Sequence, residues 1–273
     1  MRLGLIGFGN IATTLLGLMR QTGLSVEDLT VLTLPEFADE TRTRLGADFA
    51  DVAKDCGVVT GAEGLLSAQP DLVIECAGHA AVTAHVPPVL RAGMDVVIVS
   101  IGALADAALE SSVRNAAAEG GARLILPAGA VGGIDLLSAL GVAGGLIVRY
   151  RGTKPPKAWT GTPAEGLLDL PGLGERTVFF TGNARQAATD YPKNANVAAT
   201  LALAGAGFEE TQVELVADPE ATGNSHEYSV ESPLARYSIR IENQASAGNA
   251  KTSVTTVWSV LREIRNRIGP VAV

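Results

Sequence analysis

The first half of the chain alternates short apolar runs with longer segments whose apolar residues recur at helical spacing. The apolar runs are residues 2–6, 29–34, 57–60, 71–76, 95–100 and 123–126. They are continuous rather than alternating and are rich in β-branched residues, which is typical of parallel strands buried on both faces. The segments between them, such as 79–92 and 105–120, are long enough for crossover helices. The pattern therefore predicts a doubly wound parallel sheet.

A glycine-rich turn follows the first of these runs. Gly7-Phe8-Gly9-Asn10-Ile11-Ala12 has the spacing G-x-G-x-x-A and is followed by a helical pattern that ends near Gly23. The first glycine allows a sharp bend, the second lets the backbone approach a pyrophosphate, and the small third residue lets the helix pack on the strand. The N–H groups that open the helix favour an anion. A plain strand-to-helix turn is the alternative. The context favours a Rossmann-type domain that binds NAD or NADP.

The choice between the two cofactors stays open at this stage. The usual partner of the adenosine ribose is an acidic residue at the end of the second strand. Here that strand ends in Leu34-Pro35, and Glu36 comes later. Thr33 and the basic Arg42 and Arg44 leave room for a 2′-phosphate.

Ligands of a doubly wound sheet bind at the carboxyl ends of its strands. The residues there are small and glycine-rich, as a cofactor lying across the sheet edge requires, although ordinary turns use the same residues. The expected cofactor contacts in this half of the chain are Gly7, Gly9, Asn10, Ile11, Cys76, Ala77, Gly78 and Ser100.

Past Pro127 the pattern changes. A loop at 127–133 leads into an apolar helix at 134–140, and candidate strands follow at 145–152, 176–181, 212–217, 227–232 and 236–242. Several of these strands alternate polar and apolar residues, which indicates a sheet with one face in solvent or against a partner subunit. Residues 154–174 contain four prolines and four glycines and are expected to form a long irregular loop that can cover a site.

These patterns predict an α/β protein with two domains. Residues 1–130 form the dinucleotide-binding domain, and residues 131–248 form an α+β domain with a one-sided sheet for substrate binding, catalysis and oligomerisation. The segment 249–273 carries apolar residues at helical spacing and is expected to return as a helix that completes the first domain. The one-sided sheet predicts a homodimer or homotetramer formed through that face.

Composition narrows the class of function. The 273 residues are 47% hydrophobic, enough for one large core or two modest ones, and the net charge is −8. An acidic chain does not suit binding to nucleic acid or to an anionic membrane surface, so a small-molecule substrate is expected.

No apolar stretch reaches the ~20 residues of a membrane span, and Met1-Arg2 leads straight into the first strand with no room for a signal peptide. We expect a cytoplasmic protein. Its two cysteines, Cys56 and Cys76, have no metal-ligand spacing and are expected to be reduced and structural, so no metal is expected.

His226 is the best candidate for acid–base chemistry. Of the three histidines, His79 and His85 fall on a predicted helix, whereas His226 lies in the polar cluster Asn224-Ser225-His226-Glu227 that opens a strand. An unperturbed imidazole titrates near pH ~6.5 and can exchange a proton at neutral pH. The alternative is a histidine that caps the strand or pairs with Glu227.

Two polar helix starts add candidate ligands. Residues 191–196 precede an alanine-rich helix at 197–204, and residues 243–253 precede the last helix. Such residues most often cap helices, but two asparagines and a lysine at 193–196 exceed the needs of one cap. They are expected to bind the nicotinamide carboxamide or a substrate carboxylate. The candidate substrate residues are Lys193, Asn194, Asn224 and Lys251.

At this point the chain resembles the L-aspartate dehydrogenase family over essentially its whole length. The matching elements lie at 7–11, 75–78 (Glu-Cys-Ala-Gly), 100–104, 127–133 (Pro-Ala-Gly-Ala-Val-Gly-Gly), 192–200, 217–219, 223–227 (Gly-Asn-Ser-His-Glu) and 249–253. The resemblance implies an NAD(P)-dependent enzyme that oxidises L-aspartate to iminosuccinate, which hydrolyses to oxaloacetate and ammonia, or that runs the reverse amination. It implies His226 as the catalytic residue, and the glycine turn, Ala130 and Asn196 as cofactor contacts. A supply of iminosuccinate to NAD biosynthesis stays open.

Two departures from the family pattern stand out. Ala250 replaces an expected proline, which only loosens a helix start, and the missing acidic residue after the second strand bears on the choice of cofactor.

Two other classes of function stay open. One is a related reductase, such as a dihydrodipicolinate reductase or homoserine dehydrogenase, whose signatures are missing here. The other is a non-catalytic redox sensor, which has no need of the second polar constellation.

Overall fold

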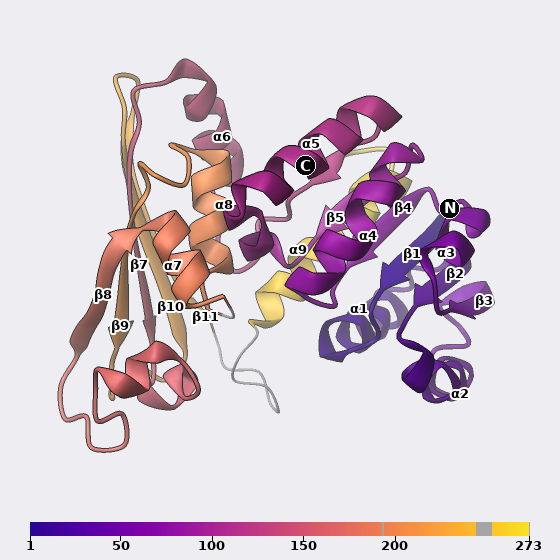
Figure 1. The fold of residues 1–273 in the computed structure, drawn as a ribbon, viewed down its shortest axis with the longest axis horizontal. Coiled ribbons are helices and arrows are strands. Elements are labelled where there is room, and N and C mark those ends of the chain that lie inside the picture. Colours follow the sequence, from indigo (N-terminus) through magenta and orange to yellow (C-terminus); the bar gives the residue numbers. More distant parts are fainter. Residues whose placement is uncertain (193, 244–252, 273) are drawn as a thin grey trace. The chain divides into compact units, whose positions relative to one another are not determined.

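The computed structural model describes residues 1–192, 194–243 and 253–272. The chain forms two compact units (Figure 1). The first unit consists of residues 1–103, 107–127 and 257–273, and the second of residues 104–106 and 128–256. Each unit has its own sheet, and each is described separately below.

The first unit is built on a six-stranded parallel sheet in the order β3-β2-β1-β4-β5-β6. Its strands are β1 (Arg2–Ile6), β2 (Val26–Leu32), β3 (Ala53–Val59), β4 (Leu72–Glu75), β5 (Asp95–Ile98) and β6 (Leu124–Ile125). The chain moves outward from β1 in one direction to β3 and then in the other direction from β4 to β6. The strand order thus reverses between β1 and β4, where a doubly wound sheet opens its ligand crevice.

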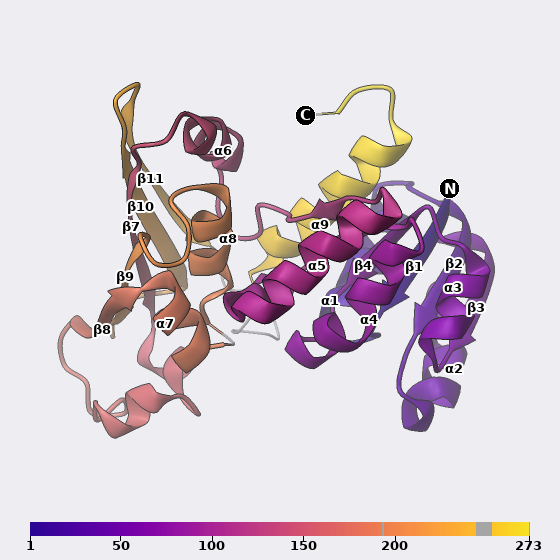
Figure 2. The same ribbon diagram turned by 45° about the horizontal axis from the view of Figure 1, so that its top comes forward.

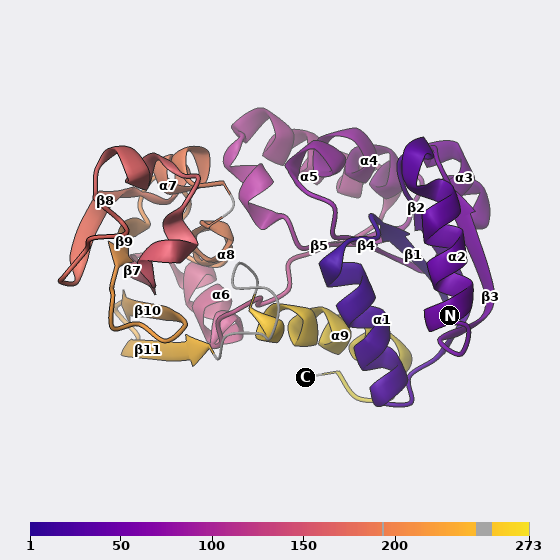
Figure 3. The same ribbon diagram turned by 90° about the horizontal axis from the view of Figure 1, so that it is seen from below.

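Helices cover both faces of this sheet, which confirms the predicted doubly wound fold. They are α1 (Asn10–Gln21), α2 (Ala38–Asp48), α3 (Ala62–Ala68), α4 (His79–Arg91), α5 (Ala107–Gly120) and α9 (Val254–Ile268). Figure 3 shows α1 and α9 on one side of the strands and α4 and α5 on the other. Every residue of β4 and β5 is buried as a result, which is why these runs are continuously apolar.

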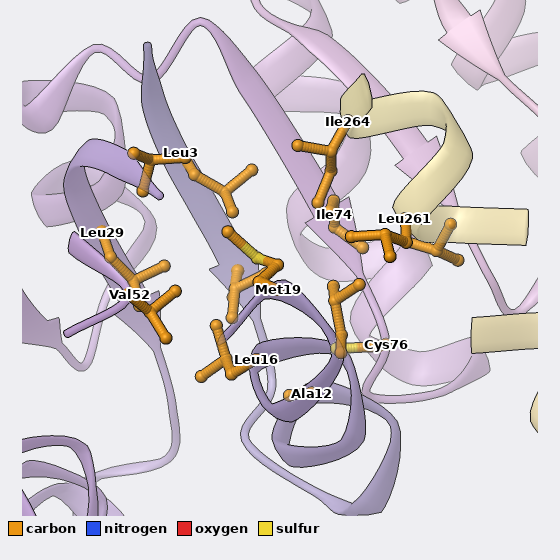
Figure 4. Close-up of a cluster of buried hydrophobic side chains, with 14 of the residues drawn as sticks. Leu3, Ala12, Leu16, Met19, Leu29, Val52, Ile74, Cys76, Leu261 and Ile264 are labelled. Atoms are coloured by element: carbon orange, nitrogen blue, oxygen red, sulfur yellow. The ribbon is translucent and has the colours of Figure 1, made fainter. Parts of the chain in front are cut away.

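The C-terminal helix packs into the core of the first unit. Leu261 and Ile264 of α9 lie close to Ile74 of β4 (Figure 4). Leu16 and Met19 of α1 belong to the same hydrophobic cluster. Two other apolar residues of α9 face away from this core, since Trp258 is 41% and Ile268 44% exposed. Val257, Val260, Leu261 and Ile264 are the residues that anchor the helix.

The second unit has a five-stranded mixed sheet in the order β11-β10-β7-β9-β8. Its strands are β7 (Ile147–Lys154), β8 (Thr177–Asn183), β9 (Gln212–Ala217), β10 (Asn224–Glu231) and β11 (Arg236–Asn243). Only the β7–β9 pair of this sheet is parallel. The helices α6 (Ile134–Ala143), α7 (Ala184–Asp190) and α8 (Asn196–Ala204) lie on one face of it (Figure 2). Along β10, His226, Tyr228 and Val230 are buried and alternate with partly exposed residues, so the predicted one-sided sheet is confirmed.

Two sequence expectations need correction, and the helices α2, α3 and α7 were not predicted. The run at 57–60 was expected to be a buried strand, but it is part of the edge strand β3, in which Cys56 is exposed. Residues 154–174 are not a plain loop. Lys154 ends β7, two 3₁₀ helices follow at Pro156–Trp159 and Pro163–Gly166, and the buried Trp159 indole donates to the Val216 carbonyl oxygen at 3.1 Å.

Among the residues that the structure describes, none of the helices combines the length and the apolar composition that a membrane crossing needs.

Candidate functional site

The two glycines of the turn after β1 have different roles. Gly7 has φ +95°, and a Cβ there would lie 2.7 Å from the Ala77 Cβ in the loop after β4. Glycine at this position is therefore required by the fold itself. At Gly9 the backbone is extended, and a Cβ would meet nothing within 4 Å. Gly9 thus borders open space, as a glycine that admits a pyrophosphate must.

Helix α1 begins at Asn10 in a form suited to an anion. Its N-cap is Gly9, no side chain caps the helix, and its first turn contains no acidic residue. The amide groups at Asn10 and Ile11 therefore point out of the helix without a side-chain acceptor, at the positive end of the peptide dipoles. These features fit the phosphates of a dinucleotide, which is the role that the sequence predicted for this turn.

The Glu75 carboxylate holds the loops that follow β4 and β5. Glu75 ends β4 and is fully buried. Its Oε1 accepts hydrogen bonds from the amides of Ala77 and Gly78, both at 2.8 Å, and from the Ser100 hydroxyl at 3.0 Å. Its Oε2 accepts the Ser100 amide at 3.0 Å. Four donors therefore satisfy the buried charge and tie the loop after β4 to the loop after β5.

Cys76 plays a different part from its neighbours. Its Sγ lies 3.5 Å from the Ile6 carbonyl oxygen and 3.7 Å from that of Gly7, and burial raises the pKa of the thiol well above its ordinary value. The thiol is therefore neutral and directed into the protein. Of the predicted contacts in this loop, Cys76 can offer a ligand only its backbone, whereas Ala77 and Gly78 lie in the turn beyond it.

The end of β2 leaves the choice of cofactor open. The strand ends at Leu32, and the next residue is Thr33. The Arg44 guanidinium lies 5.4 Å from the ring centre of Phe8 in the glycine turn, and Arg42 pairs with Asp39 at 2.6 Å. Arg44 thus lies beside the predicted phosphate-binding turn.

In the second unit, His226 is buried and paired with a tyrosine. The His226 Nδ1 lies 2.8 Å from the Tyr150 hydroxyl, and the side chain is 4% exposed. Strand register places Gly152 opposite His226, and a Cβ at Gly152 would lie 2.6 Å from the Tyr150 hydroxyl. The glycine therefore leaves the room in which Tyr150 reaches His226. Tyr150 occupies Nδ1, which leaves Nε2 as the ring atom for proton exchange with a ligand.

A buried lysine adjoins this pair. Lys154 follows Gly152 by two residues on the same face of β7 and is 5% exposed. Its Nζ donates to the Asn194 Oδ1 at 2.7 Å and lies 5.2 Å from the ring centre of Trp159. Burial lowers the pKa of Lys154 to about 8. Burial, and then the charge of Lys154, lower the pKa of His226 to about 3, so the imidazole is uncharged at neutral pH.

Of the other predicted residues of the second unit, Asn194 joins this cluster. Asn194 contacts Lys154 directly, and Asn196 opens α8 two residues later. Asn224 opens β10 opposite Asn243, whose side-chain amide donates to the Ala130 carbonyl oxygen at 3.2 Å. Strand pairing thus brings Ala130 to the end of β10 at which Asn224 lies. Lys193 and Lys251 lie outside the described residues.

Sequence reasoning missed Glu75, Tyr150 and Lys154 as site residues. For Glu75 there was a signal, because it is a charged residue that ends an otherwise apolar strand. Lys154 was assigned to a loop because Pro155 and Pro156 follow it. For Tyr150 the only signal was its place in an alternating strand, which does not reveal a partner 76 residues away.

Two family models match successive parts of the chain. A family model described as "Homoserine dehydrogenase, NAD binding domain" matches residues 7–127, and one described as "Aspartate dehydrogenase, C-terminal" matches residues 135–267. The L-aspartate dehydrogenase of Ruegeria pomeroyi is 42% identical over 97% of this chain and 92% of its own length. That of Cupriavidus taiwanensis is 40% identical over the full length of both chains.

The chain belongs to the L-aspartate dehydrogenase family. The crystal structure of aspartate dehydrogenase from Thermotoga maritima agrees, with a TM-score of 0.75 and 28% identity over 99% of this chain and 98% of that one. A hyperthermophilic archaeal homoserine dehydrogenase has a TM-score of 0.56 at 10% identity over 98% of both chains, which shows a shared fold alone. The resemblance read from the sequence motifs is confirmed.

The two glycines of the turn give a matched pair of variants. Gly7→Ala is expected to lower the free energy of unfolding by roughly 2–4 kcal/mol, because the methyl group clashes with Ala77 and alanine resists the positive φ. Gly9→Ala is expected to leave stability unchanged within ~0.5 kcal/mol but to weaken NAD(P)H binding at least about tenfold, because the methyl group enters the pyrophosphate space. Denaturant unfolding and fluorescence titration measure the two effects. Equal losses of stability in both variants would contradict this division of roles.

Burial of neutral His226 predicts an acid-sensitive stability. The pKa of His226 is about 3 in the folded chain against an ordinary 6.5. Below pH 6.5 the imidazole therefore takes up a proton in the unfolded chain but stays neutral in the folded chain. Stability is therefore retained above that pH and falls as the pH decreases toward 3. Between pH 7.5 and pH 5, the wild type is expected to lose about 2 kcal/mol more than His226→Asn, which does not titrate. Parallel unfolding curves for the two proteins at both pH values would refute a buried neutral imidazole.

Proposed function

We propose that this protein is an L-aspartate dehydrogenase that oxidises L-aspartate with NAD⁺ or NADP⁺ to iminosuccinate, which hydrolyses to oxaloacetate and ammonia, or that runs the reverse amination. The observation that carries the proposal is the buried His226, bonded to Tyr150 and adjoining Lys154, in a chain 42% identical to a named L-aspartate dehydrogenase over nearly its whole length.

The nicotinamide cofactor supplies the acceptor for the hydride that leaves the substrate Cα. The first unit contributes its binding loops. Gly9 leaves space for the pyrophosphate, the start of α1 receives its charge, and Glu75 holds the loops that carry Ala77, Gly78 and Ser100 in place. Ala130 and Asn196 are proposed as further cofactor contacts, on the strength of the family motifs that contain them.

His226 is proposed as the group that moves the protons. The substrate amine must be neutral before hydride can leave, and water must later add to the imine. An uncharged imidazole is in the form that accepts a proton. Tyr150 keeps the ring in place through Nδ1, and burial raises the pKa of the tyrosine, so the phenol stays protonated. Proton transfer therefore takes place at Nε2 of His226.

The sheet of the second unit supports an oligomer. On the face without helices, charged side chains pair across strands, with Arg149–Glu231 at 2.8 Å and Arg151–Glu214 at 2.6 Å. A cavity of about 290 Å³ on this face is lined by both arginines, Glu214 and Ser229. We propose that this face meets the same face of a second copy in a homodimer or homotetramer, in which arginines and glutamates can exchange partners. A cytoplasmic location stays a prediction.

Turnover tests the proposed reaction. We expect L-aspartate to drive reduction of NAD⁺ or NADP⁺, measured by absorbance, well above homoserine, glutamate and malate, and oxaloacetate with ammonia to drive the reverse. His226→Asn should lower kcat at least about 100-fold, the usual size of acid–base catalysis, and change the Kd of the cofactor less than about twofold. His85→Asn, on α4 of the first unit, is the matched control and should retain activity. Cofactor binding without turnover of aspartate would exclude the proposal and favour another substrate or a sensor.

Sedimentation measures the proposed assembly. The chain has a mass of 28.0 kDa, and we expect particles of twice or four times that mass. Ser229→Arg places a bulky charge on the open face and should shift the protein toward single chains, whereas Ser67→Arg, on the exposed side of α3, should not. A wild-type protein that sediments as a single chain would rule out the oligomer.

A further inference from the structure

Among the described residues, the buried Lys154 ammonium has no acidic partner. In the described parts of the chain, no carboxylate oxygen lies within the 4.0 Å of an ion pair from its Nζ. The residues outside the described ranges, 193, 244–252 and 273, include no aspartate or glutamate side chain. Taking an ammonium out of water is costly unless an opposite charge compensates for it. The described side chains do not supply that charge.

The surroundings of Lys154 hold the ammonium without neutralising it. Asn194 accepts one of its three N–H bonds, and the face of Trp159 attracts the cation weakly. Asp218 directly follows β9, and its amide donates to the Lys154 carbonyl oxygen while its carboxylate faces Arg176 at 3.9 Å. Lys154 is thus oriented, and it retains donors for a ligand.

We propose that Lys154 binds one carboxylate of the dicarboxylate substrate and that Asn194 positions the ammonium for it. The inference rests on the proposed function, which requires a dicarboxylate beside His226. Lys154 and His226 lie diagonally on the same face of the paired strands β7 and β10, a geometry in which long side chains reach one another. A carboxylate held by Lys154 therefore places the rest of a four-carbon substrate within reach of the imidazole.

Binding at Lys154 also changes the chemistry of His226. The positive charge of Lys154 is one of the two causes that lower the pKa of the imidazole. A carboxylate paired with the ammonium cancels much of that charge, so His226 becomes a stronger base when the substrate is present. The substrate would thereby prepare the group that removes its own proton.

Succinate is the probe for this site, because it is a four-carbon dicarboxylate that lacks the reacting amine. We expect calorimetry to detect succinate binding to the wild type and Lys154→Met to weaken it at least about 30-fold, the loss typical of a severed charge pair. Lys157→Met, three residues further on at an exposed position, is the matched control and should bind succinate normally. Equal affinity of Lys154→Met and the wild type for succinate would overturn the proposal.

The pH dependence of succinate binding tests whether the charged form of Lys154 is the one that binds a carboxylate. Succinate is a dianion throughout the range from pH 7 to 10, so only the protein titrates. We expect its Kd to rise by about tenfold per pH unit above pH 8 as Lys154 loses its proton. His226 and Tyr150, which adjoin Lys154, keep their charge in this range because their pKa values are shifted away from it, and Asn194 and Trp159 do not titrate. Affinity that is constant up to pH 10 would contradict the role of the ammonium.

Kinetics complete the test. Lys154→Met should raise the KM for L-aspartate far more than it lowers kcat, and Lys154→Arg, which keeps the charge, should recover part of the loss. If Lys154→Met has an unchanged KM and a low kcat, Lys154 acts as a base and does not bind the carboxylate. If the wild type oxidises aspartate while Lys154→Met retains its KM, the inference fails and the proposed function stands. If succinate binding depends on Lys154 but aspartate is not oxidised, the proposed function fails and the carboxylate site stands.

Stability guards against a variant that merely misfolds. Lys154→Met removes a desolvated charge and should melt at or above the temperature of the wild type at pH 7. Lys154→Gln, which is shorter and polar, provides a second uncharged variant with the same expected loss of succinate affinity. A lower melting temperature in both variants would show that Lys154 stabilises the fold, and would overturn its proposed role in binding the substrate carboxylate.

Discussion

A charge that is removed from water must find a partner, and this constraint organises both units of the protein. In the first unit the buried Glu75 carboxylate finds four donors within the chain, two of them from the loop after its own strand and two from Ser100. Its need for partners thereby fixes the shape of both loops. In the second unit the buried Lys154 ammonium finds one amide oxygen and an aromatic face. A satisfied charge builds a scaffold, whereas an incompletely satisfied one marks a place for a ligand.

Strand pairing decides which side chains share each environment. The parallel order of β1, β4 and β5 brings the glycine turn, the Ala77 loop and Ser100 to one edge of the first sheet. In the second sheet the antiparallel register of β7 and β10 sets Gly152 against His226. Because side chains alternate along a strand, Tyr150 and Lys154 fall on the same covered face as His226. A slip of one residue between β7 and β10 would put His226 on the opposite face from Tyr150 and Lys154, so the candidate site depends on this register.

The sequence was most informative where local pattern and local structure coincide. All six strands of the first sheet and all five of the second were found near their true positions, because apolar runs and alternation are local signals. His226 was selected as a candidate by its polar neighbours and by the family motif, and its catalytic role stays a prediction. Burial of His226, its bond to Tyr150 and the position of Lys154 were not found, since they depend on a pairing between segments some 76 residues apart. The prolines after Lys154 suggested a loop, although proline also follows naturally where a strand ends.

The electrostatics of the second unit link binding to reactivity. A histidine whose pKa lies near 3 is a weak base, so burial beside a cation disfavours the very proton transfer that His226 is proposed to perform. The two observations are compatible if the charge of the substrate is part of the site. A substrate carboxylate that pairs with Lys154 reduces the repulsion between the ammonium and a protonated imidazole, while Tyr150 keeps the ring in place. A substrate without that second carboxylate would leave the cation uncompensated and His226 a poor base. Specificity for a dicarboxylate would then arise in the proton-transfer step as well as in binding, because the same charge serves both.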